Sequence, residues 1–97
     1  YMVIEGMAEG AIKLGIPAKD AYTFAAQSVL GAAALVLETG EHPAVLRDAV
    51  CSAGGTSIGV VAALEASGFK GAIMEAMDRS SEKFLAMEAK AVEDLNK

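Results

Sequence analysis

Several features that mark common classes of protein are missing from this sequence of 97 residues. It contains a single cysteine, so no internal disulfide can form, and a single histidine, so a zinc site would need outside ligands. Lys and Arg number 8 against 13 Asp and Glu, and this acidic balance argues against nucleic-acid binding. There is also no P-loop, no His-Glu-x-x-His and no Gly-x-Gly-x-x-Gly after a strand. Any catalysis must therefore use groups or a cofactor supplied from elsewhere.

What the sequence does contain is an excess of apolar residues, at 54% of the chain with a mean hydropathy of +0.39. A domain of this length has a small core, so we expect part of this apolar surface to meet a partner. No basic leader precedes an apolar segment, and the lone cysteine gives no sign of an oxidising compartment, so we expect a cytoplasmic protein. Because the chain starts at Tyr1, we also expect it to be a piece of a longer protein.

The longest stretch without charge, residues 21–37, raises the possibility of a membrane span. A spanning helix needs about 20 predominantly apolar residues. This stretch is shorter, contains Thr23, Gln27 and Ser28, and is rich in alanine and glycine. We therefore expect a buried helix in an oligomer and no membrane contact.

Helical periodicity recurs along the chain, and sustained apolar/polar alternation is absent. The pattern predicts an all-α protein with five helices, over about residues 1–14, 17–39, 43–51, 56–66 and 70–97. Gly15, Gly40 and Gly68 follow three of these segments, where helices commonly end. The second segment is apolar all round, which predicts burial on most of its sides. We expect residues 1–97 to form a single domain.

Two further patterns concern helix packing. Gly6 and Gly10 form a Gly-x-x-x-Gly pair that would let two helices approach closely, either within the chain or between interlocking subunits. In the last helix a heptad-like stripe contains Met77, Ser80, Phe84, Met87 and Ala91.

The segment Cys51-Ser52-Ala53-Gly54-Gly55-Thr56-Ser57-Ile58 carries the strongest local signal for a binding site. Adjacent glycines let the backbone approach a ligand, and hydroxyl residues suit the first turn of a helix, where unpaired N–H groups collect. Such a junction favours an anion, and a carboxylate is the predicted ligand. A simple connector between two helices is the alternative that the local pattern leaves open.

Other single residues have simpler interpretations. His42 precedes Pro43 and could act as an acid or base, but helix capping is the better explanation because it lacks an orienting carboxylate partner. Cys51 is expected to be a small buried residue. The methionines are expected to be adaptable core residues: Met2, Met7, Met74, Met77 and Met87.

The segment His42-Pro43-Ala44-Val45-Leu46-Arg47-Asp48-Ala49-Val50-Cys51-Ser52-Ala53-Gly54-Gly55-Thr56-Ser57-Ile58 closely resembles the signature of the pyrroline-5-carboxylate reductase family. Shorter matches to the same family are Ala25-Ala26-Gln27, Leu30-Gly31-Ala32-Ala33, Glu38-Thr39-Gly40, Leu64-Glu65, Gly68-Phe69 and Met74-Glu75-Ala76. The resemblance implies the C-terminal helical domain of such an enzyme, without its N-terminal dinucleotide-binding domain. It also implies an interlocked homodimer, as in the 6-phosphogluconate dehydrogenase-like superfamily, and dimers of this family can assemble into rings.

The resemblance further implies reduction of L-1-pyrroline-5-carboxylate to L-proline with NADPH or NADH. In the family the glycine loop holds the substrate carboxylate, which assigns substrate binding to Ser52, Gly54, Gly55, Thr56 and Ser57. Ser57 is also the candidate catalytic residue, since the hydroxyl at this position lies near the ring nitrogen in the family.

The chain departs from the family pattern at three positions. Ser57 is usually threonine, Ala53 is often proline, and Val60 is usually a small residue. None of these changes removes a polar group, so they bear on efficiency rather than on the kind of reaction.

Two alternatives remain at this stage. One is a non-catalytic dimerisation module. The other is the helical domain of a related hydroxy-acid dehydrogenase, which would need a catalytic lysine near the glycine loop. Lys13 lies in the first predicted helix and Lys70 beyond the fourth, so neither suits that role.

Overall fold

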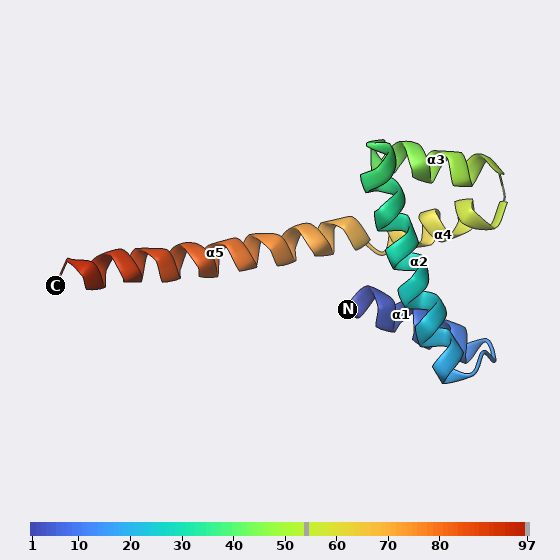
Figure 1. Ribbon diagram of the computed structural model, residues 1–97, viewed down its shortest axis with the longest axis horizontal. Coiled ribbons are helices and arrows are strands. Elements are labelled where there is room, and N and C mark those ends of the chain that lie inside the picture. The colour runs from blue at the N-terminus through green and yellow to red at the C-terminus, as the bar shows by residue number, and fades with distance from the viewer. Residues whose placement is uncertain (54, 97) are drawn as a thin grey trace. The chain divides into compact units, whose positions relative to one another are not determined.

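A computed structural model describes residues 1–53 and 55–96. These residues form five helices and no strand, which confirms the predicted all-α class (Figure 1). The helices are α1 (Met2–Lys13), α2 (Ala18–Thr39), α3 (Pro43–Ala53), α4 (Gly55–Ala66) and α5 (Phe69–Leu95). Their contacts divide the chain into two compact units, Tyr1–Val50 and Cys51–Lys97.

The three glycines predicted to end helices do so with left-handed backbone angles. Gly15 follows α1 with φ of 105°, and Gly40 and Gly68 follow α2 and α4 with φ of 70° each. Glycine adopts this conformation without the steric penalty that a Cβ atom imposes. At the end of α2 the turn is closed further, because the backbone N–H of Glu41 donates to Oγ1 of Thr39 at 3.1 Å.

The core of the first unit lies where α1 packs along the start of α2 (Figure 1). Ala8, Ala21 and Ala25 are its buried residues, and Ile4 and Ala11 pack against them. Small side chains let the two backbones come close, as the alanine content predicted. Gly6 and Gly10 lie outside this contact, since a Cβ atom at either would meet nothing within 4 Å. Within the first unit the Gly-x-x-x-Gly pair is not the packing surface, and its use between subunits stays a prediction.

Two expectations about burial are wrong for the chain by itself. Helix α2 is not buried on most sides: Ala21 and Ala25 are buried, while Phe24, Leu30 and Leu37 are exposed. The methionines are not core residues either, and all of them are exposed: Met2, Met7, Met74, Met77 and Met87. The physical reason is that two small helical units have too few neighbouring helices to cover these faces.

In the second unit α4 packs against α5 around the turn at Gly68. The two helix axes differ by 48°. Nζ of Lys70, in the first turn of α5, lies 2.9 Å from Oε1 of Glu65 near the end of α4. None of the described residues of α4 or α5 is buried. This unit therefore presents an almost completely exposed pair of helices.

Helix α2 is long and apolar enough to cross a membrane when length and composition alone are considered. Helices α4 and α5 meet the same criterion only when they are taken together as one bent segment. Helices that pack in protein interiors have the same composition, so this criterion does not separate a span from a subunit contact. The expectation of no membrane contact stays a prediction.

Candidate carboxylate site at the start of helix α4

The structure places the predicted site residues on both sides of the junction between α3 and α4. Ser52 is exposed in the last turn of α3, Gly55 is the first residue of α4, and Thr56 and Ser57 follow in its first turn. Thr56 is exposed and Ser57 is half-buried. Gly54, the remaining predicted residue, lies outside the described residues. Ser52 also takes part in an interaction of its own.

The junction is shorter than the sequence predicted. Helix α3 continues to Ala53 instead of ending near Cys51, and α4 begins at Gly55 instead of Thr56. Alanine has the highest helix propensity, whereas proline at the same position would remove an N–H donor and disfavour helix in the residue before it. Ala53 therefore lets α3 run two residues closer to the glycine pair than predicted.

The first turn of α4 supplies the donors that an anion needs. The N–H groups of the first residues of a helix have no partner within the helix, and the helix dipole places partial positive charge there. A Cβ atom at Gly55 would meet nothing within 4 Å, so the space beside its backbone is open in this chain. The hydroxyls of Thr56 and Ser57 add donors in the same turn.

Charged side chains are absent from the sequence around this turn. Residues 49–64 contain no Asp, Glu, Lys, Arg or His, and the flanking charges are Asp48 and Glu65. No group of three or more possible metal ligands occurs among the described residues. Residues 49–64 themselves can therefore offer backbone and hydroxyl hydrogen bonds and a helix dipole, without a charged side chain.

The capping role predicted for His42 is confirmed. Nδ1 of its imidazole accepts a hydrogen bond of 3.0 Å from the N–H of Ala44, and its carbonyl oxygen accepts one of 2.9 Å from Val45. His42 is thus the N-cap residue of α3, with Pro43 at the first helical position.

The remaining candidates lie outside the first turn of α4. Cys51 has a free thiol and is half-buried rather than fully buried. Lys13 lies in the last turn of α1, and Lys70 pairs with Glu65. Lys70 is thus engaged by a carboxylate at the far end of α4.

An apolar hollow of about 430 Å³, which was not predicted from the sequence, lies between α2 and α3 within the first unit. The signal that could have found it is the recurrence of apolar residues at helical spacing in both helices. Its lining residues come from the second half of α2 and from α3: Gly31, Ala32, Leu35, Val36, Pro43, Leu46, Arg47 and Val50.

The described residues do not fit a nicotinamide dinucleotide. Such a cofactor is held at a turn between a parallel strand and a helix, with a Gly-x-Gly-x-x-Gly sequence. The described part of the chain contains no strand, and the sequence contains no such motif. If this site works with a nicotinamide, another part of the protein must hold it.

Comparison with known proteins gives a consistent result. The sequence profile described as "Pyrroline-5-carboxylate reductase dimerisation" matches residues 1–87. A pyrroline-5-carboxylate reductase of Escherichia coli (strain K12) is 54% identical over 83 residues, which cover 86% of this chain and 31% of the relative. The reductase of Methanosarcina acetivorans is 49% identical over 83 residues, with the same coverage of 86% and 31%. That of Arabidopsis thaliana is 44% identical over 77 residues, covering 79% of this chain and 28% of the relative.

The matched region is thus 31% of the length of the bacterial relative and includes the junction between α3 and α4. The match of the family profile extends over all of helices α1 to α4 and most of α5. The chain therefore belongs to the pyrroline-5-carboxylate reductase dimerisation family.

Proposed function

We propose that this chain is the dimerisation and substrate-binding part of a reductase that converts L-1-pyrroline-5-carboxylate to L-proline with NADPH or NADH. The observation that carries the proposal is the family match over residues 1–87, which includes the hydroxyl-rich first turn of α4. The named relatives are themselves pyrroline-5-carboxylate reductases, and this chain corresponds to about a third of their length.

The substrate carboxylate is assigned to the start of α4. The N–H groups and hydroxyls of this turn suit a carboxylate, and the proposed contacts are Ser52, Gly54, Gly55, Thr56 and Ser57. The absence of charged residues between Asp48 and Glu65 is consistent with this ligand. A protonated pyrroline-carboxylate carries one negative and one positive charge, so the ligand itself balances the charge that the protein does not.

Within the reaction, the role of this chain is positioning. The protonated imine is already electrophilic, so the protein has to hold its ring in a fixed orientation rather than form a covalent intermediate. Ser57, which is half-buried in the first turn of α4, is proposed to hydrogen-bond near the ring nitrogen. We assign no covalent nucleophile to this chain.

The reductant is proposed to bind outside the described residues. A reduced nicotinamide supplies the hydride in reactions of this class. Because the described part of the chain is helical, that cofactor needs a dinucleotide-binding domain elsewhere in the protein. The choice between NADPH and NADH is a property of that other domain.

The partner of the chain is proposed to be a second copy of itself. Dimers are proposed to assemble further into rings, and the protein is proposed to work in the cytoplasm. The family description names dimerisation. The exposed apolar residues of α2 and α5 are the surface that such an assembly would cover.

The activity is tested with the full-length protein. We expect oxidation of NADPH or NADH that depends on pyrroline-5-carboxylate, and no oxidation of proline-sized 2-hydroxy acids in the reverse direction. Absence of imine reduction by a folded, dimeric protein would favour the non-catalytic module. Activity with hydroxy acids would favour the related dehydrogenases.

The site is tested separately with proline as the probe. Hydrogen exchange of backbone amides should slow in residues 52–57 when proline is added to the full-length protein with oxidised cofactor. Slowing elsewhere, with no change in this segment, would identify it as a connector.

A further inference from the structure

Large apolar side chains are exposed in both units of the chain, among them Leu30 and Leu37 of α2 and Phe84 and Met87 of α5. Apolar residues of this kind form the interfaces of obligate dimers, which bury more than about 2000 Å² in total. The family description names dimerisation, so a second copy of the chain is the occupant considered for these surfaces.

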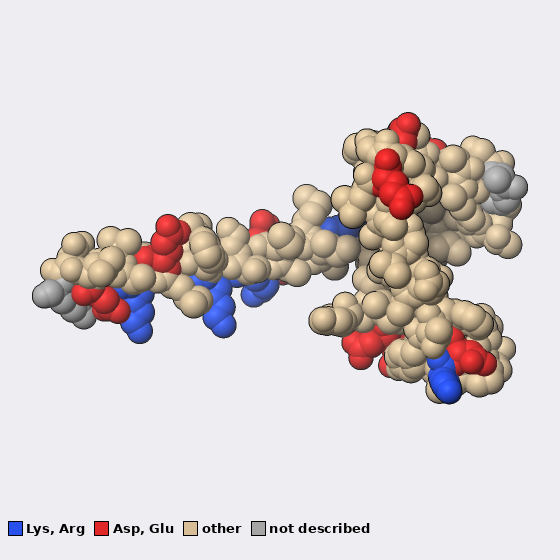
Figure 2. Space-filling model, in the orientation of Figure 1, with Lys and Arg blue, Asp and Glu red and all other residues tan. Residues whose placement is uncertain are grey.

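The hollow between α2 and α3 is the concave part of this surface. It lies within the first unit and measures about 430 Å³. Leu35, Leu46 and Val50 line it with apolar side chains, and Arg47 is the charged residue among its lining groups. Arg47 is partly exposed and makes a loose contact of 3.4 Å with the adjacent Asp48. Figure 2 shows acidic side chains grouped near the end of α2, whereas most of the middle of this helix is uncharged on the visible side.

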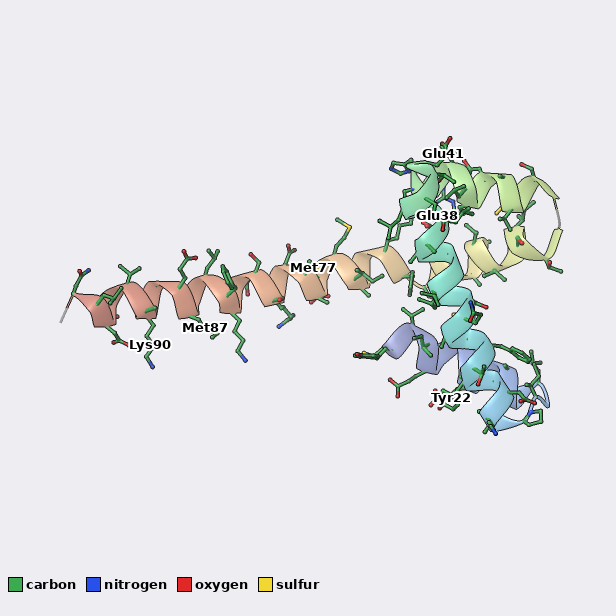
Figure 3. All side chains as sticks on the ribbon, viewed as in Figure 1. Tyr22, Glu38, Glu41, Met77, Met87 and Lys90 are labelled. Atoms are coloured by element: carbon green, nitrogen blue, oxygen red, sulfur yellow. The ribbon has the colours of Figure 1, made fainter. Side chains whose placement is uncertain are left out.

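Helix α5 supplies the convex part. Its apolar face contains Ile73, Met77, Phe84 and Met87, and all four side chains are exposed. Figure 3 labels Met77 and Met87 on α5, and Figure 2 shows charged residues of both signs along this helix. Glu88 interrupts the apolar face, because it lies one turn after Phe84 on the same side.

Pairing of α5 with a second α5 explains this face less well. The heptad that begins with Ile73 and Met77 would place Ser80, Ala91 and Asp94 in the seam, where large apolar residues are needed. A hollow needs only a few large side chains at one place, and Phe84 and Met87 supply them. Glu88, which lies beside them, has the charge opposite to that of Arg47 in the lining of the hollow.

We propose that α5 of a second copy docks in the hollow between α2 and α3, with Phe84 and Met87 inserted and the partner's Glu88 facing Arg47. By two-fold symmetry the same contact forms twice in the dimer. The inference rests on the homodimer in the proposed function and deepens it by naming the two surfaces that meet. Glu88 lies just beyond the residues that the family profile matches, so this charge pair is proposed from the present sequence.

Charge reversal in the full-length protein tests the pairing. Arg47→Glu and Glu88→Arg should each raise the dimer dissociation constant by about tenfold or more, because each places like charges together at the contact. The double variant Arg47→Glu/Glu88→Arg should restore the dissociation constant measured by sedimentation. Glu82→Arg is the matched control, since residue 82 lies on the opposite side of α5 from Phe84, and it should leave dimerisation unchanged. Failure of the double variant to recover, with each single variant folded by circular dichroism, would overturn the pairing.

A cross-linking experiment locates the contact even where charge variants perturb folding. In a Cys51→Ser background, chains with Leu46→Cys and chains with Met87→Cys are co-expressed with different tags and then oxidised. We expect a disulfide between the two kinds of chain, and none when Glu82→Cys replaces Met87→Cys. A dimer without the first cross-link overturns this inference but leaves the proposed function standing. If the full-length protein is a monomer, both this inference and the proposed homodimer are wrong. If the cross-linked dimer forms but the protein does not reduce the imine, only the proposed reductase activity is wrong.

Discussion

At the scale of single residues, His42 shows how a side chain with catalytic potential can have a structural role. Its Nδ1 accepts the N–H of Ala44, which would otherwise lack a partner in the first turn of α3. The imidazole is therefore engaged at the nitrogen that a base would use. The sequence could predict capping because no carboxylate follows His42 at helical spacing, and Gly40 separates it from Glu38 before it.

His42→Ala should lower the free energy of unfolding by about 1 kcal/mol, the usual value for loss of an N-cap acceptor. His42→Asn keeps an acceptor oxygen at the cap and should lie within a few tenths of a kcal/mol of the wild type. Urea denaturation of the three proteins at one protein concentration measures both differences. Equal destabilisation by the two variants would show that the imidazole matters for a reason other than the cap bond.

Substitution of Ser57 gives the most direct test of the proposed reaction. A single hydrogen bond has a net value of about 0.5–1.5 kcal/mol, so Ser57→Ala should lower kcat/KM for the imine by about twofold to tenfold. Ser57→Thr keeps the hydroxyl and should retain activity. Ser67→Ala, at the other end of α4, is the control and should be neutral. Unchanged kcat/KM in Ser57→Ala would remove this hydroxyl from the mechanism.

At the scale of elements, helix ends were more predictable than helix faces. Gly15, Gly40 and Gly68 mark ends because the left-handed conformation favours glycine, which is a local property. The end of α3 was predicted less well, because Ala53 carries no stop signal and the helix extends through it. The start of α4, where the candidate site lies, could also be predicted, because its glycine and hydroxyl residues are a local signal. The hollow between α2 and α3 could not, because it depends on tertiary packing.

The turn between α4 and α5 allows a paired glycine experiment. Gly68 has φ of 70°, so Gly68→Ala should destabilise the protein by roughly 1 kcal/mol through backbone strain. Gly71 lies in the helical first part of α5, where a Cβ atom would meet nothing within 4 Å. Gly71→Ala should therefore stabilise the protein by up to about 1 kcal/mol. Thermal unfolding of both variants gives the two signs, and a stabilising Gly68→Ala would contradict the turn geometry.

At the scale of the whole molecule, burial could not be predicted from the sequence of one chain. The methionines and the apolar sides of α2 have the composition of a core, yet the buried residues among those that the structure describes are three alanines. An apolar composition indicates that side chains will be buried from solvent, but it does not show whether their own chain or a partner buries them. The excess of apolar residues predicted a partner surface, and the exposed apolar side chains of α2 and α5 are the residues proposed to form it.

A core of Ala8, Ala21 and Ala25 gives a single chain little hydrophobic stabilisation, so folding and association should be coupled. The midpoint of urea unfolding should then rise with protein concentration, as expected when a folded dimer is in equilibrium with unfolded monomers. Circular dichroism over a hundredfold range of concentration measures this shift. The Arg47→Glu and Glu88→Arg variants should unfold at lower urea than the wild type at each concentration, and their double variant should recover. A midpoint independent of concentration would mean that the isolated chain folds without its partner, in which case its exposed apolar faces serve some contact other than an obligate dimer.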